Sequence, residues 1–155
     1  MILSFVLSCS ASQKHHHSRS VKADVTEKKI SKKELPAEVL KSFEEKYPSA
    51  KITGQLKETR EGIAYYEIES IDSSRRRDLL FQVDGKIIEV EESISLHELP
   101  RFVQDSVRVK FPGATITSAE RSTRDSHVEY ELVLGDGKKT REVVVNSAGK
   151  VFKIK

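Results

Sequence analysis

Few residues in this sequence of 155 could carry out nucleophilic or acid–base chemistry. The only cysteine is Cys9, and outside a histidine run near the N-terminus the histidines are His97 and His127. A catalytic nucleophile needs a base and an orienting acid beside it, and a metal needs several converging ligands. We expect His97 in a linker and His127 at the start of a strand, both exposed to solvent. The sequence therefore predicts no enzyme, no metal site and no cofactor.

The strand-like segments contain many glutamate side chains, whose carboxylates could act as acids or bases. A glycosidase-type acid pair needs two carboxylates in a cleft that separates their pKa values. Here the carboxylates alternate with apolar residues, which places them on one solvated face of a sheet. We expect cross-strand ion pairs with Arg75, Arg76, Arg77 and Arg141, each contributing a few tenths of a kcal/mol. The carboxylates concerned are Glu67, Glu69, Glu129 and Glu131, with Glu89 and Glu91 as further members.

Tyr65 lies among these charged residues on the same strand face. An aromatic side chain surrounded by charged groups is typical of a protein-binding patch. The alternative is a strand edge at which Tyr65 simply covers its neighbours. The binding hypothesis places a partner on a face formed by Tyr65, Glu67, Leu80, Glu129, Glu131 and Val144.

These residues belong to a segment that occurs twice in the chain. A shift of 64 residues, without gaps, aligns Leu35-Pro36 with Leu99-Pro100 and Tyr47-Pro48 with Phe111-Pro112. The same shift aligns Tyr66-Glu67 with Tyr130-Glu131 and Gly85-Lys86 with Gly149-Lys150. Such self-similarity indicates a duplicated supersecondary unit. Each copy is near the roughly 60-residue size at which burial is marginal, so we expect a shared core.

Each copy begins with an amphipathic helix between two prolines and continues with strands. Val39, Leu40, Phe43 and Tyr47 recur at helical spacing, and Pro48 ends the pattern. Alternating residues and Asp-Gly or Ala-Gly turns then predict a meander of four strands. We expect an α+β fold with about eight antiparallel strands in a shared sheet and both helices on one face.

The N-terminus has the composition of a secretory signal. Residues 1–9 are apolar, too short to span a bilayer as a helix, and end at Cys9. Val6-Leu7-Ser8-Cys9 resembles a bacterial lipobox, which implies cleavage before Cys9 and lipidation of its thiol. Ser10 after the cysteine is typical of sorting to the outer membrane in Gram-negative bacteria. No Lys or Arg precedes the apolar run, so the true start is expected upstream, and an incidental cysteine is the alternative.

Residues 10–33 read as a flexible tether that carries the basic excess of the chain. The segment has seven Lys and Arg residues against two acidic ones, whereas residues 34–155 have 20 against 22. A nucleic-acid reader should instead carry its basic excess on the folded part. His15, His16 and His17 present no fixed geometry for a metal. A solvated spacer is the main interpretation, and contact with anionic lipid head groups is the alternative.

The order of these motifs resembles the PepSY-like domain of the β-lactamase-inhibitor-protein-like group. The motifs are Leu-Pro at a helix start, Tyr-Pro or Phe-Pro at its end, Tyr-Glu-Ile or Tyr-Glu-Leu in a strand, and a final Asp-Gly-Lys or Ala-Gly-Lys. The resemblance covers residues 35–155 and implies a small periplasmic or lipid-anchored protein of a Gram-negative bacterium. The namesake inhibitor grips its target with the open face of its sheet. No inhibitory loop residue of this chain matches, so that activity is not carried over.

We therefore expect a signal end at 1–9, a tether at 10–33, repeats at 34–92 and 99–155, and a linker at 93–98. The expected function is a non-enzymatic lipoprotein that binds an envelope protein or peptide through the open sheet face. The alternative is a structural or envelope-stress lipoprotein without a dedicated partner, and an enzyme is a distant third. The sequence predicts no nucleic-acid partner, membrane contact only through a lipid anchor, and no particular oligomeric state.

Overall fold

The computed structural model describes residues 25–137 and 139–154. The predictions for Cys9, the signal segment and most of the tether lie outside these residues. The described strands are β1 (Val25–Lys29), β2 (Lys51–Arg60), β3 (Ile63–Asp72), β4 (Arg75–Gln82), β5 (Ile87–Ile94), β6 (Thr115–Arg124), β7 (His127–Gly135), β8 (Thr140–Asn146) and β9 (Val151–Ile154). The helices are the 3-10 turn η1 (Lys32–Glu34), α1 (Ala37–Lys46) and α2 (Arg101–Lys110).

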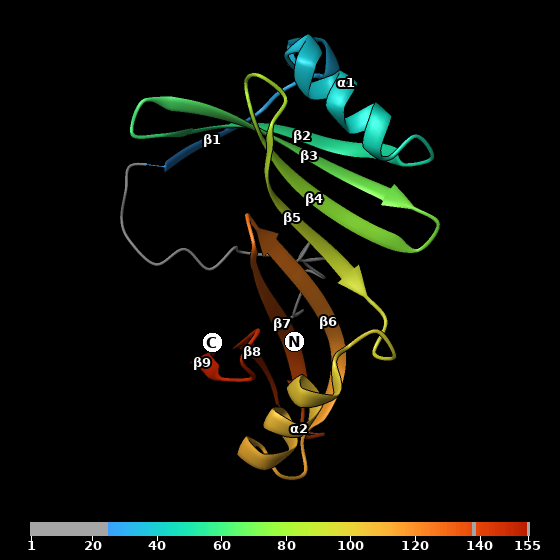
Figure 1. Cartoon of the computed structure of the whole chain (residues 1–155), viewed down its shortest axis with the longest axis vertical. Coiled ribbons are helices and arrows are strands. Elements are labelled where there is room, and N and C mark those ends of the chain that lie inside the picture. Colours follow the sequence, from blue (N-terminus) through green and yellow to red (C-terminus); the bar gives the residue numbers. More distant parts are fainter. Residues whose placement is uncertain (1–24, 138, 155) are drawn as a thin grey trace, which may run out of the picture.

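All nine strands form one sheet, in which each strand pairs with the next in the chain. Every pairing is antiparallel. Figure 1 shows the sheet running without a break from the α1 half to the α2 half, with β5 and β6 at the centre. The predicted α+β class is confirmed, with nine strands in place of about eight.

The additional strand, β1, corrects the predicted extent of the tether. Residues 25–29 fall inside the predicted spacer, residues 10–33. They pair with Leu56–Arg60 of β2 and therefore belong to the sheet. The sequence Val-Thr-Glu-Lys-Lys is charged and mostly exposed, so it shows no apolar alternation. Backbone hydrogen bonding to a neighbouring strand orders it instead.

Both helices begin directly after a proline and end at the predicted aromatic residue. Pro36 and Pro100 are the N-caps, and Tyr47 and Phe111 are the C-caps. A serine and a glutamate close a turn before each helix. The backbone N–H of Ser31 donates to the carboxylate of Glu34 (2.8 Å), and that of Ser95 donates to the carboxylate of Glu98 (3.0 Å). The backbone N–H of each glutamate donates in return to the serine carbonyl oxygen, so the two repeats have the same closed turn before the helix.

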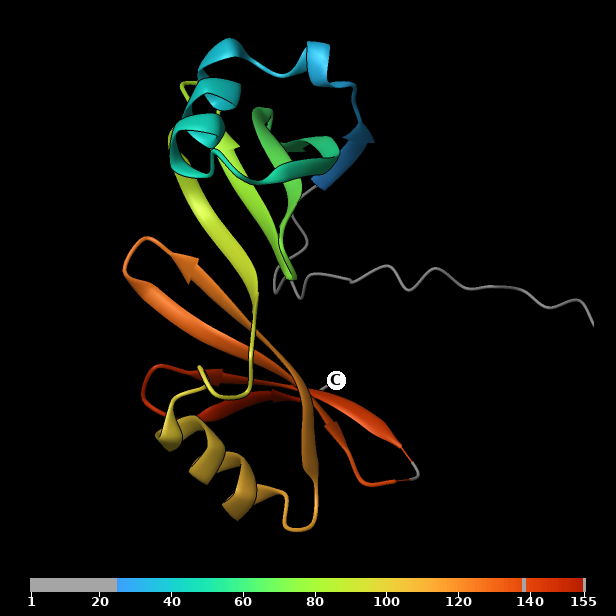
Figure 2. The same cartoon turned by 90° about the vertical axis from the view of Figure 1, so that its right-hand side faces the viewer.

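The two helices cover the same face of the sheet. Val39 and Phe43 of α1 pack on Ile68, Leu79 and Phe81. In the other half, the α2 core is built from Val103, Val107, Leu132, Leu134 and Val143. The buried side chains form two separate clusters, so the predicted shared core is wrong, because Glu92 lies between Val90 and Ile94 on the same face of β5. Both clusters still line one face of the sheet, since Leu79 faces Val90 and Ile94 faces Ala119. Figure 2 shows the two helices at opposite ends of the molecule, with the twisted sheet between them.

Two hairpin turns hold the helices close to the sheet. Gly85, in the β4–β5 turn, has φ +83°, and a Cβ there would lie 2.5 Å from the carbonyl oxygen of Glu38 in α1. Gly149, in the β8–β9 turn, approaches Ser106 and Phe102 of α2 in the same way. Only glycine combines this backbone conformation with so close an approach.

Candidate functional site

The face of the sheet opposite the helices, called the open face below, is strongly acidic. Strand alternation places on it the residues of β3–β8 that point away from Ile68, Leu79, Leu132 and Val143. Its carboxylates in these six strands are Glu67, Glu69, Asp78, Glu89, Glu91, Glu120, Glu129, Glu131 and Glu142. Against these nine acidic groups the same strands place only Arg76 and Arg124 on the open face.

The predicted ion pairs of this face are wrong for three of the four arginines. Arg75 and Arg77 share the helix face with Leu79, and Arg141 shares it with Leu134. Only Arg76 lies on the open face, where it pairs with Glu120 at 3.4 Å. Arg124 instead pairs with Glu89, whose carboxylate also accepts a hydrogen bond from Ser122 at 3.2 Å. In β3–β8 most acidic side chains therefore lie on the open face, whereas most arginines lie on the helix face.

The three apolar or aromatic residues predicted to anchor a partner are largely covered. Leu80 is 4% exposed and Val144 is 6% exposed. Tyr65 is half-buried, and the guanidinium carbon of Arg60 lies 5.2 Å from the centroid of its ring. In β3–β8, one large apolar side chain of the open face is exposed to solvent. It is Ile63, the first residue of β3. The open face of the described strands thus offers charge rather than an apolar patch.

The predicted acidic residues share this face, but β3, which carries Glu67, is separated by three strands from β7, which carries Glu129 and Glu131. Glu67 faces Leu80 across the ladder, and Glu131 faces both Glu120 and Val144. Glu129 is exposed, whereas Glu67 and Glu131 are half-buried. Gly54 of β2 leaves room beside this row, since a Cβ there would lie 2.0 Å from Oε2 of Glu69.

Among the described residues, neither His97 nor His127 lies in a site suited to catalysis. His97 is exposed in the β5–α2 loop, and His127 is exposed at the first position of β7. Within residues 25–137 and 139–154, no group of three or more His, Cys, Asp or Glu side chains could hold a metal ion. A depression of about 390 Å³ lies on α1 and is lined by Ala37, Leu40, Lys41, Glu44 and Glu45. It is open to solvent, whereas an active site is usually an enclosed cleft.

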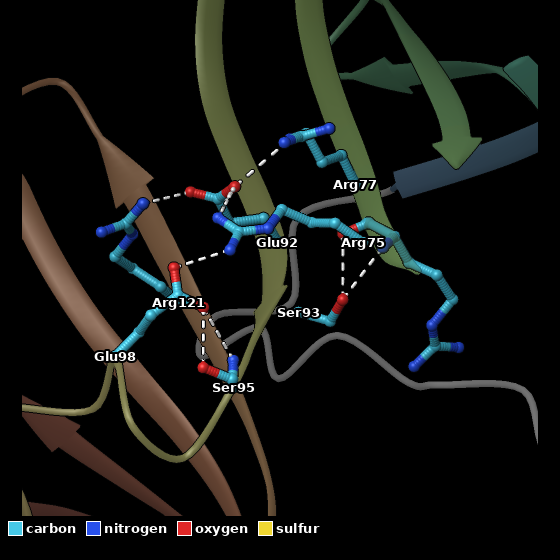
Figure 3. A network of polar contacts seen from close by, with 8 residues as sticks. Arg75, Arg77, Glu92, Ser93, Ser95, Glu98 and Arg121 are labelled. Atoms are coloured by element: carbon cyan, nitrogen blue, oxygen red, sulfur yellow. Dashed lines mark hydrogen bonds and ion pairs between the residues drawn. The ribbon is translucent and has the colours of Figure 1, made fainter. Parts of the chain in front are cut away.

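A second polar site lies on the helix face, between the two cores. Figure 3 shows Glu92 of β5 at its centre, with Arg77 and Arg121 on either side. Glu92 accepts hydrogen bonds from Arg75 (3.3 Å), Arg77 (3.2 Å) and Arg121. Arg75 also donates to Glu98 at 2.6 Å. We call these five residues, Arg75, Arg77, Glu92, Glu98 and Arg121, the junction cluster.

The junction cluster lowers the pKa of both its carboxyl groups. Partial burial raises the pKa of Glu92, but the hydrogen bonds and charges of Arg121 and Arg75 outweigh it, and the net pKa lies below 4.5. The Arg75 hydrogen bond and the Ser95 backbone N–H lower the pKa of Glu98 to about 2. Both groups are therefore ionised at neutral pH.

One guanidinium nitrogen of this cluster has no polar acceptor. Arg77 Nη1 is buried and finds no hydrogen-bond partner among the described residues. The ring of Tyr47 lies against this guanidinium, with its centroid 4.8 Å from the central carbon. Burial in turn raises the pKa of Tyr47, and Arg77 opposes that rise. The cluster joins the α1 half to the α2 half through charges on β4, β5 and β6.

Sequence reasoning missed this cluster, although two signals in the sequence point to it. In β5, Glu92 interrupts the apolar residues Val90 and Ile94 at a position that shares their face. In β6, Arg121 does the same between Ala119 and Thr123. A charge in the middle of an apolar face needs a partner.

Three solved crystal structures share this fold at low sequence identity. A DUF2874 family protein from Bacteroides uniformis has a TM-score of 0.61 and 13% identity over 77% of this chain and 88% of its own. A protein from Bacteroides eggerthii, described as "putative periplasmic", has 0.61 and 14% over 77% and 87%. A BLIP-like protein from Bacteroides fragilis has 0.55 and 16% over 76% and 82%. These likenesses establish the fold.

A comparison with curated proteins gave no significant match. The family described as "Putative beta-lactamase-inhibitor-like, PepSY-like" matches residues 21–89 and again residues 64–153. The two matches overlap over residues 64–89, which include most of β3, all of β4 and the start of β5, and together they include every described strand and both α-helices in whole or in large part. The chain therefore belongs to the beta-lactamase-inhibitor-like, PepSY-like family.

Proposed function

We propose that this protein is a non-enzymatic, lipid-anchored envelope protein that binds a partner protein or peptide through the open face of its sheet. The observation that carries the proposal is the concentration of nine carboxylates on that face within β3–β8, where the same six strands place two arginines. A BLIP-like relative of the same fold supports a binding role.

The charge of the open face selects the chemistry of the partner. A surface of one sign attracts a partner of the other sign and speeds its association, and this attraction weakens as salt screens it. Because Leu80 and Val144 are covered, apolar burial adds little to recognition at this face. The partner is accordingly one that presents Lys and Arg side chains, and its affinity falls with ionic strength.

The proposed location is the periplasmic side of the outer membrane of a Gram-negative bacterium. The "putative periplasmic" neighbour from Bacteroides eggerthii and the lipobox-like residues before Cys9 support it. In the described part of the chain, no helix has the length and apolar content needed to cross a bilayer.

The second candidate is a structural or envelope-stress lipoprotein without a dedicated partner. The covering of Leu80, Val144 and Tyr65 favours it, because these residues were the predicted anchors of a partner. The two candidates differ in whether the open-face charges are needed to bind another molecule.

Affinity capture from envelope extract distinguishes them. The bait is the full chain, beside a Glu69→Lys, Glu129→Lys variant of the open face and a matched Glu44→Lys, Glu45→Lys variant of α1. Both variants change the net charge equally, and circular dichroism establishes that each is folded. The proposal expects one protein to be retained by the wild type and the α1 variant, lost by the open-face variant, and then bound directly when purified. Equal capture by all three baits contradicts recognition by the open face.

A further inference from the structure

The cationic segment of this chain lies directly before a strand that borders the acidic face. Residues 10–24 contain Lys14, Arg19 and Lys22 with three histidines, and Asp24 is their one acidic residue. This segment leads into β1, which lies at the edge of the sheet and pairs with β2. A segment with a basic excess is thus joined by the chain itself to the sheet that carries the acidic face.

The segment is long enough to cross the open face. Fifteen residues span up to about 50 Å when extended, at about 3.3 Å per residue. Neighbouring strands lie about 4.8 Å apart, so β7 is about 29 Å from β1 across six strand spacings. Lys14, eleven residues before Val25, reaches about 36 Å when extended, which is enough to cross from β1 to β7 in the direction perpendicular to the strands.

The open face fits an extended cationic chain better than a globular apolar surface. Glu69 faces Asp78, Asp78 faces Glu91, and Ser122 separates Glu91 from Glu129, which makes a row of carboxylates across five strands. A neighbouring row continues from Glu67 through Leu80 to Glu89. Rows of one charge sign attract Lys and Arg side chains and demand no apolar contact.

We propose that residues 10–24 dock across the open face of their own chain, with Lys14, Arg19 and Lys22 facing the carboxylates of β3–β7. Covalent connection favours this occupant over a separate molecule, since a short flexible linker provides an effective concentration in the millimolar range. The contact is electrostatic and reversible.

Zero-length carbodiimide cross-linking of the full chain, with Cys9→Ser to prevent disulfide dimers, tests the docking. The reagent joins a lysine amine to a carboxylate only when the two are in contact, and peptide mass spectrometry identifies the pair. Lys14 is the reporter, because it is the lysine of the segment furthest from β1. We expect Lys14 to link to the carboxylates of β5–β7, with at least a fivefold loss of yield in 1 M NaCl, where the screening length is about 3 Å.

A matched pair of variants separates docking from chance encounters. Arg19→Glu with Lys22→Glu leaves the reporter in place and removes its neighbours, and at least a fivefold loss of the Lys14 links is expected. Lys32→Glu with Lys33→Glu makes the same change of charge on η1, outside the segment, and is expected to leave the yield unchanged. A mixture of unlabelled and ¹⁵N-labelled protein distinguishes links within one chain from links between two.

Three results overturn the proposal. They are absence of Lys14 links to the open face, links that are insensitive to salt and to the segment variant, and links found only between two copies. These measurements need no partner, so their failure leaves the capture experiment standing. A negative capture experiment likewise leaves the docking result unaffected.

Discussion

Replacing Glu92 by glutamine tests whether the junction cluster stabilises the connection between the two halves. Glu92 and Arg77 are each 13% exposed in their side chains, so the change leaves a buried guanidinium without its carboxylate. The glutamine amide group also turns N–H donors toward guanidinium donors, which cannot pair.

The size of the effect follows from the burial of each arginine. Removing one partner of a fully buried ion pair costs about 3–5 kcal/mol. Arg75 and Arg121 are 30% and 40% exposed, so water replaces part of what they lose. We therefore expect Glu92→Gln to lower the free energy of unfolding by about 2–3 kcal/mol at pH 7.

Urea unfolding at pH 7, followed by circular dichroism, measures this difference. The matched control is Glu120→Gln on the open face, which removes a solvent-exposed pair with Arg76 and is expected to cost less than about 1 kcal/mol. If Glu92→Gln is no more destabilising than Glu120→Gln, the junction cluster does not stabilise the fold as its geometry indicates.

The pH dependence of the same two proteins gives a second test. The pKa of Glu92 is lower in the folded state than its ordinary value of 4.5, so the unfolded chain binds the proton more readily. Its stabilisation is present above pH 4.5 and is lost as the pH falls through the folded pKa. Wild-type stability should therefore decline more steeply below pH 4.5 than the stability of Glu92→Gln, and parallel curves would contradict the cause given for the shift.

Three further predictions concern stability. Gly85→Ala should destabilise the protein by about 1–3 kcal/mol more than Gly62→Ala in urea unfolding: both glycines have positive φ, but only a Cβ at Gly85 meets the Glu38 carbonyl oxygen. Equal losses would show that the turn can move away from α1. Leu80→Ala should cost about 2–5 kcal/mol, because Leu80 is a covered side chain, and a loss below 1 kcal/mol in urea unfolding would show that it is not packed. Glu98→Gln should flatten the decline of stability between pH 4.5 and about pH 2, because the folded pKa of Glu98 is lowered to about 2, and acid titration followed by circular dichroism measures it.

The elements that follow from local sequence were predictable. Pro36 and Pro100 begin the helices, Tyr47 and Phe111 end them, and Gly85 and Gly149 mark hairpin turns. These features depend on the conformational preferences of a few neighbouring residues. β1 was not predictable in this way, because hydrogen bonding to β2 rather than an apolar pattern makes it a strand.

The composition of each face was predictable only in part. Alternation correctly placed Glu67 and Glu69 on the face opposite Ile68. In the run Arg75-Arg76-Arg77, alternation puts the first and third arginines on one face and the second on the other, but within the run it does not identify which of these is the helix face. Pairing across strands decides it. Bulges at Ile52/Gly54, Leu80/Phe81, Ile116/Ser118 and Val144/Val145 each shift the register by one residue, and sequence alternation does not reveal them.

The pairing of every strand with its successor has a consequence for how the chain folds. Most of the ladders close through short turns, and the β1–β2 and β5–β6 ladders close around one helix each. The chain thus forms a sheet of nine strands without bringing distant segments together, which keeps its contact order low and the entropic cost of each closure small. Each hairpin can form from neighbouring segments, and once the chain has been synthesised through Gln82, β1–β4 and α1 have their native neighbours except β5 and the β4–β5 turn.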